Sequence, residues 1–462
     1  MRQPAIEKLQ EQIRGQIHQR GDDSYDEARR VHNGMHDKKP AAVVSCFDAA
    51  DVMTAVKFGR AEDLEIAVRG GAHSVPGFGT IDDGLVIDLS EMRSVYIDPD
   101  RKIGRVEGGT QWGDFDHAAS AFGLATTGGI VSTTGVGGLT LGGGIGYLTR
   151  SLGLSCDNLL SVDLVTADGE MVTASEHRNE DLFWALRGGG GNFGIAVSME
   201  FAMHPVGPTI YGGPVFFELE AAADLMAWYR DFIATAPEEL GAFFGFQIAP
   251  ELPFIPEDRI GDQLCVIVTC YNGDLASGEQ VIGSIIDSGP VVADGTGPMP
   301  YAALNSAFDP LLPSGLQHYW KADFVKELTD EAIEAHVEYG SRTPCVESTM
   351  HLYPINGAAH RVAPNETAFG HRDATFAAVI AGMWPDPDDN AANTQWVKDY
   401  YAAIHPYSGT EGGYVNFMAE DDAARVPENY GPNYARLSAV KAEWDPENVF
   451  HINQNIKPAP AQ

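Results

Sequence analysis

Glycine dominates the stretch between Thr126 and Gly169, and the same stretch contains Cys156. It reads TTGGIVSTTGVGGLTLGGGIGYLTRSLGLSCDNLLSVDLVTADG, with glycine at positions 128, 129, 135, 137, 138, 142, 143, 144 and 146. Glycine loses more backbone freedom on folding than any other residue. A chain that uses it so densely therefore needs unusual backbone dihedral angles or very close approach to a bulky group. A ligand with phosphates and a large flat ring would account for these features.

A second glycine-containing loop, RGGAHS, covers residues 69–74 and contains His73. Before this loop come, in chain order, the β-rich run AAVVSCF, a helix expected at about 49–60 and the β-rich run EIAV. This order predicts a β-α-β unit that leads directly into the loop. The successive amide N–H groups of such a loop can form a concave site for a pyrophosphate. Read alone, however, a histidine in a glycine loop is more often a turn residue than a reactive one.

A third glycine cluster lies in RGGGGNFGI, where Gly189, Gly191 and Gly194 satisfy the spacing G-x-G-x-x-G of dinucleotide-binding folds. That motif requires a strand before the loop and a helix after it. Here the pattern DLFWAL predicts a helix before the loop, and IAVSMEF predicts a strand after it. The context excludes the dinucleotide fold. A phosphate-binding P-loop is excluded as well, because no lysine in the chain is followed by serine or threonine.

Composition limits the classes of partner. The chain has 462 residues, with 30 Lys and Arg against 65 Asp and Glu, so its formal net charge is −35. Such a charge repels nucleic acid and anionic membrane surfaces. No apolar run reaches the roughly 18 residues that a membrane span needs, and no apolar signal core precedes Arg14. We expect a cytoplasmic protein that acts on a small-molecule substrate, without a nucleic-acid, membrane or protein partner.

The cysteines and histidines do not indicate a disulfide framework or a metal site. Five cysteines, an odd number, occur at the irregular positions 46, 156, 265, 270 and 345. His32 and His36 could suggest a metal, but Asn33-Gly34 between them breaks the helix that would align their rings, and no third ligand is evident. We expect a loop there and no metal.

The second half of the chain has a different pattern. From about Val206, aromatic-rich strands such as YGGPVFFELE, AFFGFQIA and LCVIVTCY alternate with helices. Their half-buried periodicity predicts an antiparallel sheet covered by helices on one face, in a domain that runs to about His405. On its strands, His351 and Tyr353 share a face and are candidates to line a pocket, as are Gln247 and Tyr319.

Four blocks of the sequence together resemble the berberine-bridge-enzyme-like group of the vanillyl-alcohol-oxidase superfamily of flavoproteins. The blocks are AVRGGAHS, GVGGLTLGGGIGYLTRSLGLSCDNL, GGGGNFGI and NYARLSAVKAEWDPENVF, in the order of the family. The resemblance implies an α+β fold with a two-part FAD-binding domain of the PCMH type and a substrate domain with an antiparallel sheet. The implied boundaries are 1–205 and 406–462 for the two parts of the FAD-binding domain, and 206–405 for the substrate domain.

The resemblance also implies covalent FAD with two attachments. His73 matches the histidine bonded to the flavin 8α-carbon, and Cys156 matches the cysteine bonded to C6. Imidazole and thiolate are suitable nucleophiles for these electron-poor carbons. The implied cofactor-binding residues are His73, Cys156, Arg69, Gly70, Gly71, Ala72, Ser74, Gly77, Gly129, Thr133, Gly137, Gly138, Gly142, Gly143, Asn158, Leu159, Gly191, Gly194, Ile195 and Asn453.

For catalysis, the resemblance implies a tyrosinate base near the C-terminal motif, with Tyr430 of NYGPNY as the closest match and Tyr434 as the second. It further implies that Leu159 stands where side-chain size controls access of oxygen. We expect an oxidase that takes hydride from an alcohol, a saccharide or a natural-product C–H bond and reduces O₂ to peroxide. The alternatives are an FAD-dependent dehydrogenase, an oxidative cyclase or amine oxidase acting on a heterocyclic metabolite, and a flavin carrier without activity.

Overall fold

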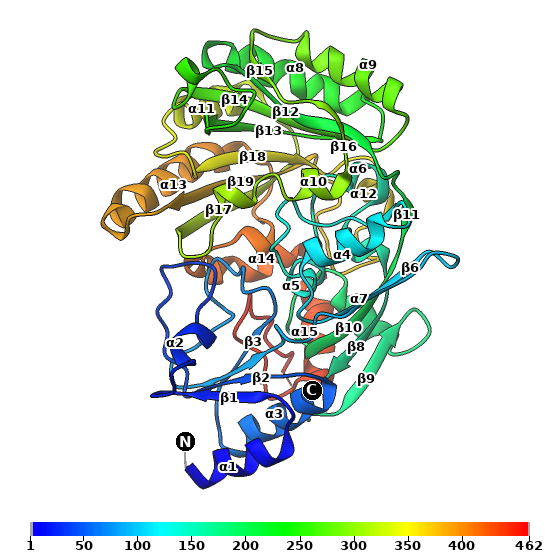
Figure 1. Cartoon of the computed structure of the whole chain (residues 1–462), viewed down its shortest axis with the longest axis vertical. Helices are drawn as coiled ribbons and strands as arrows, with labels where there is room; N and C mark the ends of the chain where they lie inside the picture. Colours follow the sequence, from blue (N-terminus) through cyan, green and yellow to red (C-terminus); the bar gives the residue numbers. More distant parts are fainter. Residues whose placement is uncertain (1–2, 461–462) are drawn as a thin grey trace.

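The computed structural model describes residues 3–460, and in these residues helices and β-sheets are mixed (Figure 1). Within that range the strands form sheets of four, five, two and eight strands. The predicted α+β class is confirmed. No helix in the described range is long and apolar enough to cross a lipid bilayer. The division at residues 205 and 405 stays a prediction, and the sheets are described here by their own strands.

The first sheet contains the predicted β-α-β unit. Its order is β1-β2-β4-β3, with β2, β4 and β3 parallel and β1 antiparallel at the edge. The bounds are β1 Gln16–Gln19, β2 Ala42–Ser45, β3 Ile66–Arg69 and β4 Leu85–Asp88, with helices α1 Gln3–Gln12, α2 Tyr25–Ala28 and α3 Ala49–Ala61. The carboxylate of Asp48 caps α3 by accepting hydrogen bonds from two of its first amides. Because β3 ends at Arg69, the loop with His73 starts where the strand stops.

The second sheet is antiparallel, in the order β5-β6-β10-β8-β9. The bounds are β5 Val95–Asp98, β6 Ile103–Glu107, β8 Leu159–Val165, β9 Met171–Ser175 and β10 Ile195–Ala202; the short pair is β7 Leu124–Ala125 and β11 His204–Pro205; the helices are α4 Trp112–Ser120, α5 Val136–Leu141, α6 Thr149–Leu152 and α7 Glu180–Leu186. The predicted helix before and strand after the third glycine cluster are confirmed as α7 and β10.

The third sheet is the predicted antiparallel sheet, in the order β15-β12-β14-β13-β18-β19-β17 with β16 paired to β12. Its strands are β12 Ile210–Glu218, β13 Leu240–Ile248, β14 Gln263–Tyr271, β15 Val291–Asp294, β16 Gly297–Met299, β17 Gln317–Val325, β18 Thr349–Pro354 and β19 Phe376–Trp384. Helices α8 Ala222–Thr235, α9 Leu275–Ile286, α11 Asp330–Gly340 and α13 Asn390–Ile404 cover its outer face (Figure 1). The short helices α10 Tyr301–Asn305 and α12 Ala358–Arg361 complete this region.

Alternation along the strands separates the two faces of the third sheet. In β19, Ala378 and Ile380 belong to the core under the covering helices, whereas Val379 and Ala381 belong to a different core that includes Ile145 of the glycine-rich stretch. Successive side chains of a strand point to opposite faces, so each strand contributes to both cores. The inner face of this sheet therefore meets the N-terminal half of the chain.

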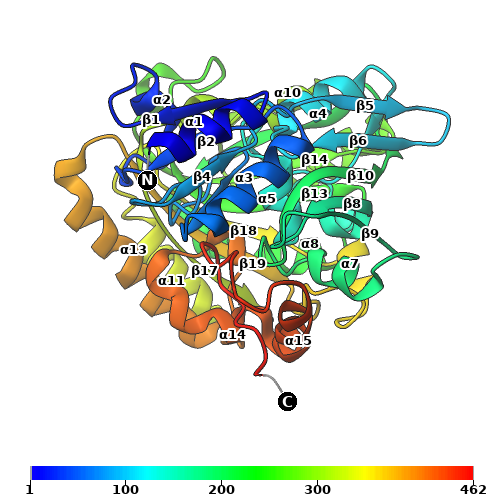
Figure 2. The ribbon, with the colours of Figure 1, turned by 90° about the horizontal axis from the view of Figure 1, so that it is seen from below.

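The C-terminal segment returns to the N-terminal half. Helices α14 Val426–Tyr430 and α15 Tyr434–Trp444 precede an irregular segment, and α15 packs beside α7. Figures 1 and 2 show this orange-to-red segment alongside the N-terminal half. Asn192, in the third glycine cluster, donates to the carbonyl of Gln454 and accepts from the amide of Ile456. The two ends of the chain thus form one structural unit around that cluster.

A buried ion pair holds the C-terminal segment against the N-terminal half of the chain. The Lys441 ammonium contacts Asp445 Oδ2 at 2.6 Å, the carbonyl of Asn192 at 2.6 Å and the carbonyl of Phe450 at 3.0 Å. Both charged side chains are fully buried. Asp445 also accepts hydrogen bonds from the amides of Val449 and Phe450. A buried charge is tolerated only when it is paired and hydrogen-bonded in this way.

Replacing Lys441 by Met should leave Asp445 buried without its counter-charge. We expect the free energy of unfolding to fall by about 3–5 kcal/mol. Urea denaturation would measure it, with Lys457→Met, an exposed lysine of the same segment, as the control. The double variant Lys441→Met with Asp445→Leu should be more stable than Lys441→Met alone, and a single variant as stable as the unmodified protein would contradict this role.

Candidate active site

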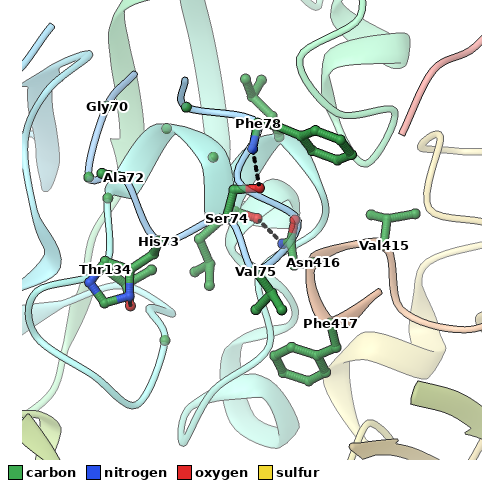
Figure 3. A pocket seen from close by; sticks show the side chains of 18 of the residues that line it. Gly70, Ala72, His73, Ser74, Val75, Phe78, Thr134, Val415, Asn416 and Phe417 are labelled. Carbon is green, nitrogen blue, oxygen red and sulfur yellow. Dashed lines mark hydrogen bonds between the residues drawn. The ribbon is translucent and has the colours of Figure 1, made fainter. Parts of the chain in front are cut away.

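One large cavity lies between the inner face of the third sheet and the glycine-rich loops. Its volume is about 350 Å³, within the range of small-molecule sites. One end is lined by most residues of the loops at 69–79, 129–141 and 190–196, without Gly77 and Thr133, and the other by strands β13, β17, β18 and β19 with residues 415–417. Figure 3 shows His73 and Thr134 at the left, Ser74, Val75 and Asn416 in the middle, and Val415 and Phe417 at the right. The cavity thus joins the loops expected to hold a cofactor to the sheet expected to hold a substrate.

The loop after β3 offers unpaired backbone donors to this cavity. The amide N–H groups of residues 71–75 donate no hydrogen bond to any described part of the chain. Gly70, Gly71, Ala72, His73 and Ser74 all line the cavity. Ala72 has a φ of 60°, in the left-handed region where a side chain is disfavoured. Buried amides normally find acceptors, so this row of free donors fits the pyrophosphate of the expected cofactor.

His73 lies in a cluster of three histidines. Its ring stacks on His32 at a centroid distance of 3.9 Å, and the His32 ring is 5.2 Å from that of His318. His73 Nε2 is 2.9 Å from Thr133 Oγ1. Burial lowers the pKa of His73 well below its usual value, and the two neighbouring rings lower it further. The ring is therefore neutral at neutral pH, as a nucleophilic nitrogen requires.

His32 and His36 lie in a loop, as predicted. Among residues 3–460 there is no cluster of three or more potential metal ligands. The sequence did not reveal that His32 would stack on the candidate attachment residue.

Most of the predicted cofactor-binding residues surround the cavity. Its wall includes Arg69, Gly70, Gly71, Ala72, His73, Ser74, Gly129, Gly137, Gly138, Gly191, Gly194, Ile195 and Asn453. At Gly138 and Gly191, a Cβ atom would meet no other atom within 4 Å, so the backbone is open to the cavity. These residues come from segments far apart in the sequence, and the fold brings them together.

Cys156 lies outside the described cavity wall, and its predicted bond to the flavin stays a prediction. It is fully buried in the core with Leu154 and Tyr414, and it is not among the described residues that line the cavity. Its Sγ atom is 3.7 Å from Asp157 Oδ1, and Asp157 is bound to the buried guanidinium of Arg372. Burial raises the pKa of the thiol, which opposes formation of the nucleophilic thiolate. The structure gives Cys156 a packing role and does not place it at the cavity.

Other predicted cofactor-binding residues also lie behind the wall. Asn158 bonds His204 and the carbonyls of residues 152 and 154, and Leu159 is buried in the core of the second sheet. Thr133 supports His73 from outside the wall. Gly142 and Gly143 make room for other side chains of the protein: a Cβ at Gly142 would be 2.3 Å from Asn416 Oδ1.

Gly77 lies behind the wall too. Its φ is +69°, and a Cβ there would be 2.5 Å from the ring of His36. Leu159 is not among the described residues that line the cavity, and its expected control of oxygen access stays a prediction.

The two tyrosines predicted as bases are poorly suited to that role. Tyr430 borders the cavity, but its side chain is buried and its hydroxyl donates to the carbonyls of Gly189 and Gln454 at 3.2 Å. Burial raises its pKa further above the usual value. Tyr434 is half-buried against the neighbouring core and lies outside the described cavity wall. Both residues connect the C-terminal segment to the rest of the protein.

The sheet end of the cavity contains polar residues on one strand. Glu347, Thr349, His351 and Tyr353 alternate along β18 and the residues before it, and all four line the cavity. His351 Nδ1 is 2.8 Å from the Tyr353 hydroxyl, whereas its buried Nε2 has no hydrogen-bond partner. Gln247 lines the cavity, as expected. Tyr319 does not line it, and its hydroxyl instead donates to Asp421.

Several wall residues were not identified from the sequence. They are mainly apolar or aromatic and include Ile130, Val131, Leu139, Phe308, Leu311, Leu312, Trp320, Met383 and Phe417. Such residues occur in any core, so their type gave no signal. The alternation at 349, 351 and 353 was a usable signal, because it places these side chains on one face of a strand.

The chain also matches known proteins over nearly its full length. Residues 40–175 match the model of the FAD binding domain, and residues 413–457 match the model described as berberine and berberine like. An FAD-linked oxidoreductase of Dictyostelium discoideum is 31% identical over 98% of this chain and 97% of its own. The (R)-6-hydroxynicotine oxidase of Paenarthrobacter nicotinovorans is 30% identical, over 96% of this chain and 97% of its own.

Solved structures agree with the sequence relatives. The crystal structure of 6-hydroxy-D-nicotine oxidase from Arthrobacter nicotinovorans superposes with a TM-score of 0.86 at 27% identity and covers 97% of this chain and 98% of its own. The matched segments include both the loops and the C-terminal segment that enclose the cavity. This chain therefore belongs to the berberine-bridge-enzyme-like group of FAD-linked oxidoreductases.

Proposed function

We propose that the chain oxidises a small, largely apolar alcohol or amine with covalently bound FAD and passes the electrons to O₂. Bound FAD supplies a ring that accepts a hydride equivalent. The observation that carries the proposal is the single cavity that joins the free amides of the His73 loop to an aromatic chamber on the third sheet. We call one part of the cavity the chamber; it is lined by β13, β17, β18, β19, Phe308, Leu311, Leu312 and residues 415–417.

We propose one covalent attachment, through His73. This side chain is neutral, lines the cavity and is oriented by Thr133 and His32. Cys156 is buried and is not among the described residues that line the cavity, whereas Val131 is. We therefore propose no second attachment through Cys156. Arg69 anchors the start of the loop, because its guanidinium donates hydrogen bonds to the buried carboxylate of Asp88.

The chamber favours an apolar substrate over a saccharide. Phe308, Trp320 and Phe417 form its walls together with aliphatic side chains. A saccharide needs hydrogen-bond partners for most of its hydroxyl groups, because burying an unpaired polar group is costly. The few polar side chains, on β18 and at Gln247, suit a substrate with one polar end. The name of the 30% identical relative, a 6-hydroxynicotine oxidase, is consistent with a heterocyclic substrate.

The proton that leaves the substrate needs an acceptor in the chamber. We assign this role to Glu347 in place of Tyr430, because Glu347 lines the cavity, whereas the Tyr430 hydroxyl is hydrogen-bonded to backbone carbonyls. His351 is a poor proton acceptor, since burial lowers its pKa to about 3.

The attachment can be tested without any substrate. Acid-precipitated protein should stay yellow, and its intact mass should exceed that of the chain by one FAD. His73→Ala should release all flavin on acid treatment, since no cysteine is among the described residues that line the cavity, whereas Cys156→Ser should retain it. Covalent flavin in His73→Ala, or its loss in Cys156→Ser, would show that the cysteine takes part.

The substrate preference can be tested by anaerobic bleaching of the flavin absorption. Aromatic and heterocyclic alcohols and amines should bleach the flavin faster than mono- and oligosaccharides at equal concentration, because they match the apolar chamber. Colour should return in air with release of peroxide. Bleaching by saccharides alone would contradict the proposal, and slow return in air would identify a dehydrogenase instead of an oxidase.

A further inference from the structure

The cavity wall carries very few charged side chains. Among the described wall residues, only Glu347 and Arg69 are charged at neutral pH. Arg69 makes hydrogen bonds to Asp88 and to the carbonyls of residues 28 and 30, so its charge is compensated. Glu347 is half-buried, and no basic side chain in residues 3–460 forms an ion pair with it. Its carboxylate is the one uncompensated charge that the described chain presents to the cavity.

The nearby histidine does not balance this charge. His351 lies on β18, four residues after Glu347 of the preceding turn; both residues line the cavity, and burial keeps the His351 ring neutral. Gly245 is opposite His351 on β13, where a Cβ would be 2.9 Å from the ring, so the absence of a side chain makes room for it. The chamber therefore has a neutral polar group, His351, on β18 and an anion, Glu347, just before this strand.

The chamber also contains aromatic side chains beside its aliphatic ones, and their rings form a continuous series of contacts. Trp320 is 5.9 Å from Phe417, and Phe417 is 5.8 Å from Tyr353. Tyr353 is 5.5 Å from His351, which is 6.1 Å from Phe308. The faces of aromatic rings attract cations, most strongly where water is excluded. Aromatic walls combined with a single carboxylate are the usual chemistry of an ammonium site.

We propose that the chamber selects an amine substrate and binds its ammonium form against the Glu347 carboxylate and the faces of the Trp320 and Phe417 rings. This inference rests on the proposed function, because it names the substrate class of the same chamber. The net charge of −35 acts in the same direction, since a negative field concentrates cations near the protein. A neutral alcohol could donate a hydrogen bond to the carboxylate but would supply no counter-charge, and an anion would be repelled.

The test uses two ligands of equal shape that differ in charge. Phenyltrimethylammonium and tert-butylbenzene are isosteres, and neither has a carbon–hydrogen bond beside a free amine or hydroxyl. Binding to the FAD-loaded protein would be followed by the shift of the flavin absorption and by the rise in melting temperature. We expect the cation to bind at least about tenfold more tightly than the neutral isostere.

Glu347→Gln removes the charge at nearly constant shape. It should weaken binding of the cation about tenfold and leave the neutral isostere unchanged, because a half-buried ion pair is partly screened. Glu347→Asp should retain most of the preference. Glu327→Gln is the matched control: it changes the net charge equally at an exposed position just after β17, and it should leave both affinities unchanged.

Equal affinity for the two ligands, or equal loss in Glu347→Gln and Glu327→Gln, would overturn the inference. Failure of the proposed function gives a different result. A chain that lacks FAD but still shows the charge preference in its melting temperature would refute the oxidoreductase proposal and leave the ammonium site standing. A chain that holds FAD but shows no charge preference would refute the ammonium site and leave the oxidoreductase proposal standing.

Discussion

The contact between Gly71 and Gly135 is the constraint on which the site depends. A Cβ on Gly71 would lie 2.3 Å from the amide nitrogen of Gly135, so the two backbones can meet only because both residues lack side chains. This contact presses the loop after β3 against the glycine-rich stretch. It brings His73 beside Thr133 and leaves the amides of residues 71–75 free to face the cavity. The costly ordering of glycine is thus offset by a site that other residues could not form.

The third sheet and the C-terminal segment close the cavity from the other sides. The inner face of the sheet supplies the chamber, while the outer face is occupied by helices, so one sheet separates the stable core from the site. The C-terminal segment contributes Asn416 and Phe417 to the wall and is fixed by the buried Lys441–Asp445 pair. The glycine-rich loops, the chamber and the C-terminal segment are therefore linked, because all three line the same cavity.

Burial determines the charge of the groups at the site. The histidines of the His73 cluster and His351 are kept neutral because the surrounding protein excludes water. The same effect keeps the Tyr430 phenol and the Cys156 thiol protonated, which removes both as bases or nucleophiles. Glu347 is half-buried and remains the charge that a ligand would meet. In this protein, the extent to which a side chain is buried determines its protonation state and therefore whether it can react.

The sequence by itself determined the local elements and the family: the β-α-β unit, the helix before and strand after the third glycine cluster, the antiparallel sheet, and the loop with His73. These follow from short-range patterns of glycine spacing and hydrophobic period. Only the tertiary structure decided which side chains reach the cavity. Cys156 and Leu159 stand in a conspicuous motif but are buried in cores, whereas Glu347, Trp320 and Phe417 stand in ordinary strands and loops and line the cavity. The reason is physical: the direction of a side chain relative to a cavity depends on contacts between segments hundreds of residues apart, which no local pattern records.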